Sequence, residues 1–167
     1  MMKHLGKVAV LLGGDSSERE VSLLSGNEVY QGLLQAGVDA HLYDTQEQSL
    51  FDLKKQGFER VFIVLHGGAG EDGRVQAVLE TMGLPYTGCG MLASGLGMDK
   101  LRSKMIWQAA GLPVPDFAVL QDDTDFDAVE AKLGLPMFVK PAAEGSSVGV
   151  VKVTEKGTLA AVYQDLK

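Results

Sequence analysis

Short apolar runs alternate with segments of helical period along the first part of the chain, a pattern typical of a parallel sheet covered by helices. Strands are predicted over residues 8–12, 40–43 and 61–65. Ser17 and Glu20 have the spacing of a capping box at the start of a first helix, which is predicted to stop before Gly37. A second helix is predicted over residues 73–82. The expected fold class is therefore α/β, with an N-terminal parallel sheet that carries helices on both faces.

The proline-bearing stretch at residues 111–116 predicts a domain boundary. Asp99 is expected to cap a third helix, and Gly111 is expected to close it. The chain then divides into an N-terminal α/β domain, residues 1–111, and a second domain, residues 112–167.

The second domain is predicted to be an incomplete α+β lobe. Its expected elements are a strand at 117–120, a helix at 124–133 capped by Thr124, two strands flanking a glycine-serine loop, and a final helix with Leu159, Val162 and Leu166 on one face. A hairpin and two helices leave apolar faces uncovered, so the sequence is expected to stop inside a domain.

Composition excludes several classes of protein. With 46% apolar and 22% charged residues in 167, the chain has the composition of a soluble globular protein. The net charge of −7 and the scattered 15 Lys and Arg residues argue against a nucleic-acid surface. The single cysteine, Cys89, permits no internal disulfide, and no CxxC motif suggests structural zinc, so a reducing compartment is expected.

No segment of the sequence suggests a membrane protein. The apolar run at residues 8–12 is too short for the core of a signal peptide and leads directly into a charged stretch. No run approaches the roughly 18 apolar residues of a membrane span. A cytoplasmic location without membrane partners is expected.

The segment MFVKPAAEGSSVGV, residues 137–150, reads as a strand ending in Lys140, a glycine-bracketed loop and a second strand. The loop offers two hydroxyl groups and consecutive backbone N–H groups to which a polyphosphate can approach closely. Lys140 would add a positive charge, worth roughly 4 kcal/mol for a charge pair about 4 Å apart at an effective dielectric near 20. Taken alone, the segment is equally compatible with an ordinary β-hairpin.

Two further loops follow predicted strands, at the edge where open α/β sheets bind ligands. In the first, GGDSSERE, Glu18 could hold a ligand ammonium group or simply favour the helix dipole. A dinucleotide fingerprint is weak there because the third glycine is lacking. In the second, HGGAGEDG, His66 could orient a carboxylate or pass a proton, or could be a hydrogen-bonded structural residue.

Lys100 lies in the first turn of the predicted third helix, where the helix dipole disfavours a cation. An anionic ligand would account for a lysine at this position. A solvated surface lysine is the alternative.

Together these segments resemble, in order and spacing, the front half of the bacterial D-alanine:D-alanine ligase family, which belongs to the ATP-grasp enzymes. The resemblance is carried by VAVLLGGDSSEREVSLLSG, LHGGAGEDGRVQAVLETMGLPYTGCG, MDKLRSK and VKPAAEGSSVGVVKV, and it covers essentially the whole chain. It implies a pre-ATP-grasp domain followed by an incomplete ATP-grasp central lobe. The implied reaction uses ATP and Mg²⁺ to phosphorylate one D-alanine, and the amine of a second attacks the acyl phosphate, giving a peptidoglycan precursor.

The resemblance also implies roles for individual residues. Glu18 would hold the ammonium group of the first D-alanine, and His66 would lie near its carboxylate. Ser146 would anchor the loop that covers the phosphates and link it through hydrogen bonds to Glu18, so Glu18 and Ser146 are the catalytic candidates. The implied ATP-binding residues are Lys100, Lys140, Glu144, Gly145, Ser146 and Ser147.

The chain departs from the family in two ways. Gly68 and Ala69 replace bulky or charged residues, which suggests a more mobile loop. Family members are also roughly twice as long, and the other half would hold the adenine-binding strand, a mobile loop, an arginine and the acidic metal ligands. No metal ligand is therefore expected in this chain, and the chain alone is expected to be inactive.

Alternative functions stay open on the sequence alone. The chain could belong to another ATP-grasp carboxylate-amine ligase, such as a D-alanine:D-lactate ligase. It could also be a non-catalytic interaction module. A homodimer through the N-terminal domain is a further implication of the resemblance.

Overall fold

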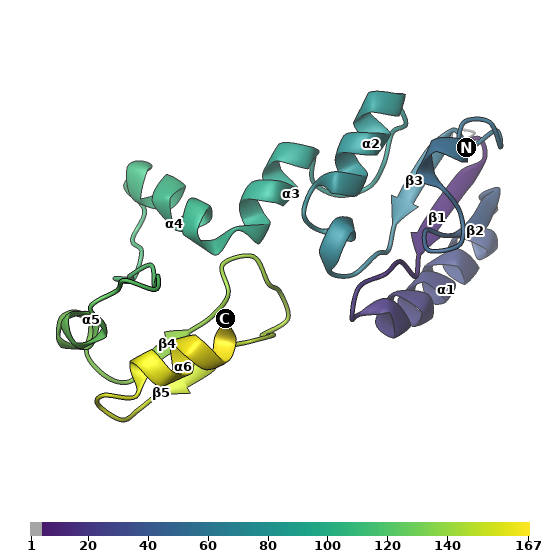
Figure 1. Cartoon of the computed structure of the whole chain (residues 1–167). Coiled ribbons are helices and arrows are strands. Elements are labelled where there is room, and N and C mark those ends of the chain that lie inside the picture. Colours follow the sequence, from purple (N-terminus) through teal and green to yellow (C-terminus); the bar gives the residue numbers. More distant parts are fainter. Residues whose placement is uncertain (1–4) are drawn as a thin grey trace. The chain divides into compact units, whose positions relative to one another are not determined.

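The computed structural model describes residues 5–167, which fall into two compact units, residues 5–97 and residues 98–167 (Figure 1). The first unit holds β1 (Val8–Leu12), α1 (Arg19–Gln35), β2 (Ala40–Asp44), η1 (Leu50–Asp52), β3 (Arg60–Ile63), η2 (Gly68–Gly70), α2 (Arg74–Met82) and α3 (Met91–Met98) except its last residue, which begins the second unit; η marks a 3₁₀ turn. The second unit then holds α4 (Lys100–Ala109), α5 (Phe126–Leu133), β4 (Met137–Val139), β5 (Val151–Val153) and α6 (Leu159–Leu166). The units divide ahead of the proline-bearing stretch at residues 111–116, so α4 belongs to the second unit.

The first unit is built on a parallel sheet with strand order β2-β1-β3. Val8 of the central strand pairs with Ala40 on one side and with Arg60 on the other. All five residues of β1 are buried. An unbroken apolar strand of this kind is expected where a parallel sheet is covered on both faces, and the predicted α/β fold class is confirmed.

Alternate residues of β1 enter two separate hydrophobic clusters. Ala9 and Leu11 belong to the larger cluster, to which α2 contributes Val75 and Leu79. Val10 belongs to the smaller cluster on the opposite face, against which side chains of α1 pack. Because successive side chains of a strand point to opposite faces, α1 and α2 cover opposite sides of the sheet, as the sequence predicts.

Helix α1 approaches the sheet closely at a buried glycine. A Cβ atom at Gly26 would lie 2.6 Å from the Cβ atom of Leu12 in β1, which is closer than side chains can approach. Gly32, six residues further along α1, has open space around the corresponding position. The absence of a side chain at Gly26 therefore sets the distance between α1 and β1.

The second unit pairs β4 and β5 as an antiparallel hairpin. Its buried apolar residues include Val153 of β5 and Leu159 of α6. Beside them the buried carboxylate of Glu130 in α5 accepts hydrogen bonds from the backbone N–H groups of Gly157, at 2.8 Å, and Leu159, at 3.2 Å. Glu130 thereby supplies acceptors for the otherwise unpaired N–H groups at the start of α6.

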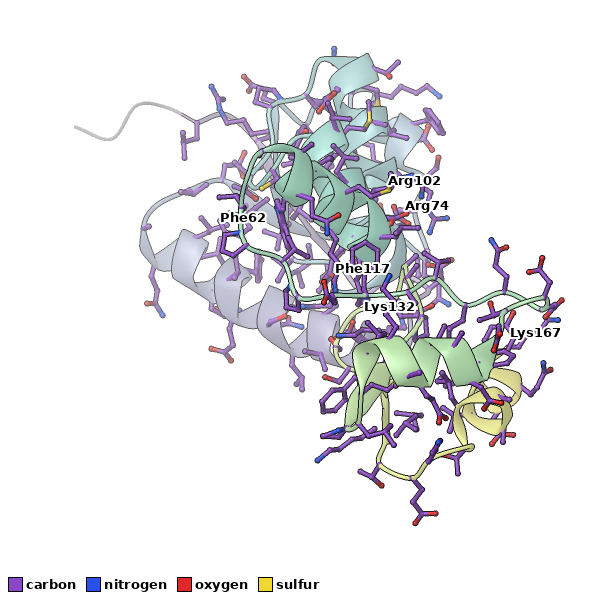
Figure 2. All side chains as sticks on the ribbon, turned by 90° about the vertical axis from the view of Figure 1, so that its left-hand side faces the viewer. Phe62, Arg74, Arg102, Phe117, Lys132 and Lys167 are labelled. Carbon is purple, nitrogen blue, oxygen red and sulfur yellow. The ribbon has the colours of Figure 1, made fainter. Side chains whose placement is uncertain are left out.

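The far end of α6 is held by a second polar contact. Lys167, labelled in Figure 2, donates to both carboxylate oxygens of Asp122, at 2.6 and 2.7 Å. The hydroxyl of Tyr163 donates to the same carboxylate at 3.1 Å. The ring of Tyr163 also packs against Phe126 of α5, with ring centroids 5.5 Å apart.

The structure corrects the predicted helix starts. The Ser17–Glu20 capping box is wrong, because α1 begins at Arg19 with Glu18 as its N-cap and without a side-chain cap bond. The helix predicted from Thr124 begins at Phe126, because Asp125 accepts from the N–H of Ala128 at 3.0 Å and acts as the cap. Asp99 caps α4 as predicted.

Two elements differ from the sequence prediction. Residues 117–120 form no strand, because this stretch has no ladder partner among the described residues. Helix α3, whose sequence MLASGLGM holds two glycines, was not predicted. Its first N–H, that of Met91, donates to the Glu80 carboxylate at 2.9 Å. No helix within residues 5–167 has the length and apolar character required to cross a membrane.

Replacing Gly26 by alanine is expected to destabilise the first unit. The added methyl group must push α1 away from Leu12, and such overpacking costs about 1–3 kcal/mol. The matched control is Gly32→Ala in the same helix, which meets no atom within 4 Å and is expected to stabilise the helix by about 0.5–1 kcal/mol. Urea denaturation of both variants measures the difference, and a Gly26→Ala variant as stable as Gly32→Ala would contradict this packing.

Candidate functional site

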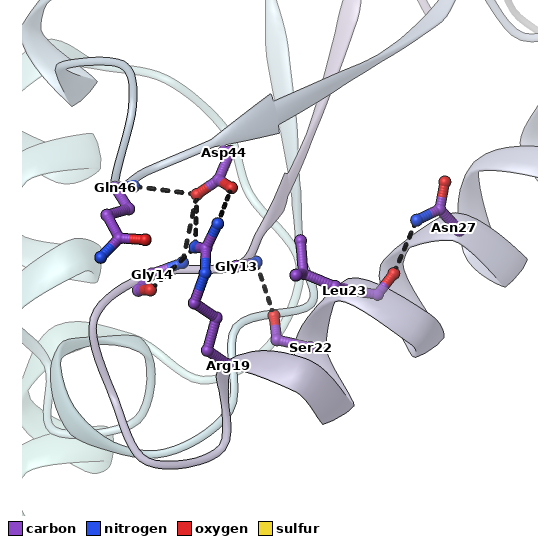
Figure 3. Close-up of polar contacts among 8 residues, drawn as sticks. All are labelled: Gly13, Gly14, Arg19, Ser22, Leu23, Asn27, Asp44 and Gln46. Atoms are coloured by element: carbon purple, nitrogen blue, oxygen red, sulfur yellow. Dashed lines mark hydrogen bonds and ion pairs between the residues drawn. The ribbon is translucent and has the colours of Figure 1, made fainter.

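The turn after β1 is braced by an ion pair (Figure 3). Gly13 and Gly14 have φ angles of 74° and 76°, in the left-handed region that favours glycine. Arg19 donates to the carbonyl of Gly14 at 2.9 Å and to both carboxylate oxygens of Asp44, at 2.9 and 2.6 Å. Asp44 in turn accepts from the N–H groups of Gly14, at 3.4 Å, and Gln46, at 3.0 Å. The bidentate pair thus joins the turn after β1 to the end of β2.

This pair is partly protected from water, since the side chains of Arg19 and Asp44 are 25% and 14% exposed. The hydrogen bonds from the Arg19 guanidinium hold the pKa of Asp44 below its ordinary value. The same contact raises the pKa of Arg19. Both groups therefore stay charged across neutral pH.

Three serine hydroxyls, those of Ser16, Ser22 and Ser25, connect α1 and the loop before it to the end of β3. Ser16 donates to the carbonyl of His66 at 2.6 Å, and Ser22 donates to the carbonyl of Val64 at 2.7 Å. Ser22 also accepts from the N–H of Gly13 at 2.9 Å (Figure 3). Ser25 lies 3.0 Å from Nε2 of His66. We call Ser16, Ser22 and Ser25 the serine cluster.

The serine cluster brings the Glu18 and His66 loops together. The backbone N–H of Glu18 donates to the Ser16 hydroxyl at 3.1 Å. A Cβ atom at Gly67 would lie 2.7 Å from Oε2 of Glu18, so this carboxylate lies against the backbone next to His66. Glu18 and His66 therefore sit at one edge of the sheet, where the strand order predicts a ligand site. Their roles toward a ligand stay predictions.

The rest of the His66 loop turns back toward the core. Gly68 and Ala69 begin the 3₁₀ turn η2, and Ala69 packs against the larger hydrophobic cluster. Gln76 of α2 donates to the carbonyl of Gly70 at 2.8 Å. The mobility suggested for Gly68 and Ala69 stays a prediction.

In the second unit, Lys100 lies against the glycine-serine loop. Its ammonium group donates to the carbonyl of Glu144, and its backbone N–H donates to the carbonyl of Ala142 at 2.9 Å. The structure thus brings Lys100 and residues 142–144 together, and their role toward a phosphate stays a prediction. The carbonyl of Glu144 also provides a partner for a cation at this unfavourable end of α4.

The loop itself holds two consecutive serines in a rare conformation. Ser146 and Ser147 have φ angles of 48° and 62°, and they are the non-glycine residues with positive φ in the described part of the chain. Such a conformation costs of order 1–3 kcal/mol per residue and is found mainly at functional sites. Lys140, at the end of β4, is exposed. A strained loop beside an exposed lysine is a suitable site for an anion.

A magnesium site is not evident in the described residues. No group of three or more His, Cys, Asp or Glu side chains within residues 5–167 is arranged to hold a metal ion. Magnesium that bridges phosphates is held by one or two carboxylates together with the phosphates, so the expectation that its protein ligands lie outside this chain stays a prediction.

Family comparisons match most of the chain. Residues 44–89 match the family described as D-ala D-ala ligase N-terminus, and residues 106–167 match D-ala D-ala ligase C-terminus. The chain is 64% identical over 166 residues to a D-alanine–D-alanine ligase of Neisseria gonorrhoeae. The matched segment covers 99% of the chain and 55% of that protein. It is 60% identical to one of Laribacter hongkongensis, covering the whole chain and 54% of that protein.

Solved structures agree with these relatives. A D-alanine–D-alanine ligase of Bacillus anthracis has a TM-score of 0.85 and 37% identity, over 96% of this chain and 53% of that one. The same enzyme complexed with ATP has a TM-score of 0.83 and 36% identity, over 96% and 54%. A VanG D-Ala:D-Ser ligase of Enterococcus faecalis has a TM-score of 0.76 and 31% identity, over 95% and 58%. The chain spans about half the length of the relatives it matches.

The Arg19–Asp44 pair yields a pH-dependent prediction. Because the pKa of Asp44 is lowered on folding, the pair contributes stability above the carboxyl's unfolded pKa and loses it as the pH falls through the folded pKa. Asp44→Asn is therefore expected to lower the free energy of unfolding by about 2 kcal/mol at pH 7 and by progressively less in acid. Urea denaturation of the Asp44→Asn and parent chains, from pH 7 down into acid, measures the difference.

The control for this prediction is Asp52→Asn. Asp52 pairs with Lys55 at 3.0 Å, and both side chains are largely exposed, at 44% and 80%. An exposed pair of this kind contributes about 0–1 kcal/mol. Equal losses in the Asp44 and Asp52 variants at pH 7 would show that the Arg19–Asp44 pair does not brace the turn.

Proposed function

This chain belongs to the D-alanine–D-alanine ligase family, and we propose that its protein joins two D-alanine molecules in an ATP-dependent reaction through an acyl phosphate. The observation that carries the proposal is the Glu18 carboxylate, which lies against the backbone next to His66 at the carboxyl edge of the parallel sheet. An amino acid bound there would place its ammonium group beside Glu18. A charge pair about 4 Å apart at an effective dielectric near 20 is worth roughly 4 kcal/mol.

The residues that would hold ATP lie in the second unit. Lys100 and Lys140 would neutralise phosphate charge, and the loop from Glu144 to Ser147 would cover the phosphates. When bound, ATP supplies the phosphoryl group that activates the D-alanine carboxylate. The chain's own residues contribute charge and alignment, which a transfer between two anions needs more than a covalent nucleophile. The ATP complex of the Bacillus anthracis relative supports this assignment.

The proposal also covers the loop anchor, the metal, the location and the oligomeric state. Ser146 would anchor the loop that covers the phosphates. Magnesium would be bound by carboxylates that this chain does not contribute. A cytoplasmic location and a homodimer through the first unit complete the proposal.

The likeness to a D-Ala:D-Ser ligase supports a competing second substrate. D-Alanine and D-serine both attack through an amine, whereas D-lactate attacks through a hydroxyl. Product analysis with ATP, D-alanine and each second substrate in turn decides between them. Formation of D-alanyl-D-alanine in preference to the other products is the expected result.

Ligase activity is tested by ADP release with ATP, magnesium and D-alanine. The 167-residue chain is expected to release ADP at the background rate, and a fusion of it to the remaining part of the Neisseria gonorrhoeae relative is expected to turn over. Robust turnover by the chain alone would show that the remaining part of the enzyme is not needed for activity. Failure of an intact, folded fusion would count against the ligase assignment.

Glu18→Gln tests the amino-acid site in the chain itself. The amide has no negative charge for the ammonium group, so the affinity for D-alanine in calorimetric titration is expected to fall at least about tenfold, or 1.4 kcal/mol. The matched control is Glu20→Gln, which removes a carboxylate from the first turn of the same helix. Equal effects of the two variants would reduce Glu18 to a contribution to the helix dipole.

Lys140→Met tests the nucleotide site. Methionine removes the charge and keeps an apolar stem, so the affinity for ATP is expected to fall about tenfold or more. Lys152→Met is the control, because Lys152 is an exposed lysine on the neighbouring strand β5. Calorimetric titration with ATP measures both, and unchanged binding by Lys140→Met would remove Lys140 from the site.

A further inference from the structure

We propose that Ser25 is a positioning residue that fixes the neutral His66 ring as the Nε2–H tautomer. Nδ1 is then left as a hydrogen-bond acceptor for the ammonium group of the bound amino acid. The identity of this ligand rests on the proposed function. The tautomer itself rests only on contacts inside the first unit.

The Ser25 hydroxyl has one proton to donate, and this decides the tautomer of His66. The Ser25 hydroxyl lies 2.8 Å from the carbonyl oxygen of Val21 and 3.0 Å from Nε2 of His66. A carbonyl oxygen can only accept, and a hydroxyl has one proton to donate. Both contacts are hydrogen bonds at once only if Ser25 donates to Val21 and accepts from Nε2–H.

A second carbonyl reinforces this assignment. The carbonyl of Ser22 lies 3.5 Å from the same hydroxyl and is likewise only an acceptor. Ser25 sits inside α1, so its hydroxyl is held on the helix carbonyls of the preceding turn. The backbone of His66 is held separately, by the 2.6 Å bond from Ser16 to its carbonyl. Ring and backbone are therefore both positioned from the same segment of the chain.

The tautomer decides which ligand group His66 can bind. In a neutral ring with its proton on Nε2, Nδ1 has a lone pair and no hydrogen. That lone pair repels a carboxylate and accepts from an N–H group. His66 is thus expected to bind the amino acid's ammonium group, whereas the family resemblance implies a place near its carboxylate.

Glu18 is well placed to share the same ammonium group. Its carboxylate lies against Gly67, the residue that follows His66. An ammonium group has three N–H donors, so it can bond to the Glu18 carboxylate and to Nδ1 of His66 together. The two side chains would then recognise the ammonium end of the substrate together.

The first experiment observes the ring directly. The ¹⁵N spectrum of the His66 ring in the 167-residue chain, taken where the ring is neutral and assigned with His66→Ala, is expected to show the proton on Nε2. Ser25→Ala is expected to give a mixture of tautomers, and Ser25→Thr, which keeps the hydroxyl, is expected to restore the single form. A proton on Nδ1 in the parent chain, or an unchanged tautomer in Ser25→Ala, overturns the proposal.

A matched control distinguishes the loss of the Ser25 contact to His66 from the loss of any hydroxyl inside a helix. Thr81 of α2 donates to the carbonyl of Ala77 at 2.8 Å, the same four-residue back-bond that Ser25 makes. Thr81→Ala is expected to leave the His66 tautomer unchanged. A change of tautomer in Thr81→Ala would show that the ring responds to stability alone and would overturn the role of Ser25.

The second experiment identifies the ligand group. The Nδ1 resonance is followed during titration with D-alanine, with D-alaninamide, which keeps the ammonium group and lacks the carboxylate, and with propionate, which has the carboxylate alone. D-Alanine and D-alaninamide are expected to shift Nδ1, and propionate is expected not to. A shift by propionate alone overturns the acceptor role. No shift by any of the three overturns both the ligand role and the proposed amino-acid site, while the tautomer is judged by the first experiment.

Discussion

The hydrogen bonds of the serine cluster hold the proposed amino-acid site together. Val64 and His66 lie just beyond the last paired residue of β3, where carbonyl groups lose their strand partners and still need donors. Ser22 and Ser16 supply those donors at 2.7 and 2.6 Å. Ser22 is completely buried, so no water can replace it. The direction in which β3 leaves the sheet, and hence the place of His66, depends on these bonds.

The Arg19–Asp44 pair fixes the other side of the turn after β1. The serine cluster joins α1 to β3, and the ion pair joins the first residue of α1 to the end of β2. Glu18 lies immediately before Arg19. Its backbone is therefore fixed by contacts to β2 and to the end of β3, the two strands that flank β1. A carboxylate placed in this way needs little reorganisation when a cation binds, which is the condition under which electrostatic recognition is strongest.

The sequence predicted the elements of the first unit better than their junctions. The period of apolar residues identified β1, α1 and α2, and strand ends identified the loops of Glu18 and His66. The serine cluster was missed because serine is common at helix starts, although the three-residue spacing of Ser22 and Ser25 on one helix face was a signal. Helix α3 was missed because its glycines argue against a helix. The strand predicted at residues 117–120 failed because a strand exists only with a partner, which local sequence does not specify.

The two units prepare their sites by different physical means. In the first, three serine hydroxyls, of which that of Ser22 is buried, and an ion pair satisfy backbone groups, so the proposed amino-acid site would be formed before any ligand arrives. In the second, Ser146 and Ser147 are held in a costly conformation, and Lys100 donates to the carbonyl of Glu144 in the same loop. The ammonium of Lys100 has three N–H donors, so it can keep that carbonyl while it binds a phosphate oxygen. Under the proposed function, nucleotide binding would then stabilise the strained loop through the lysine that already holds it.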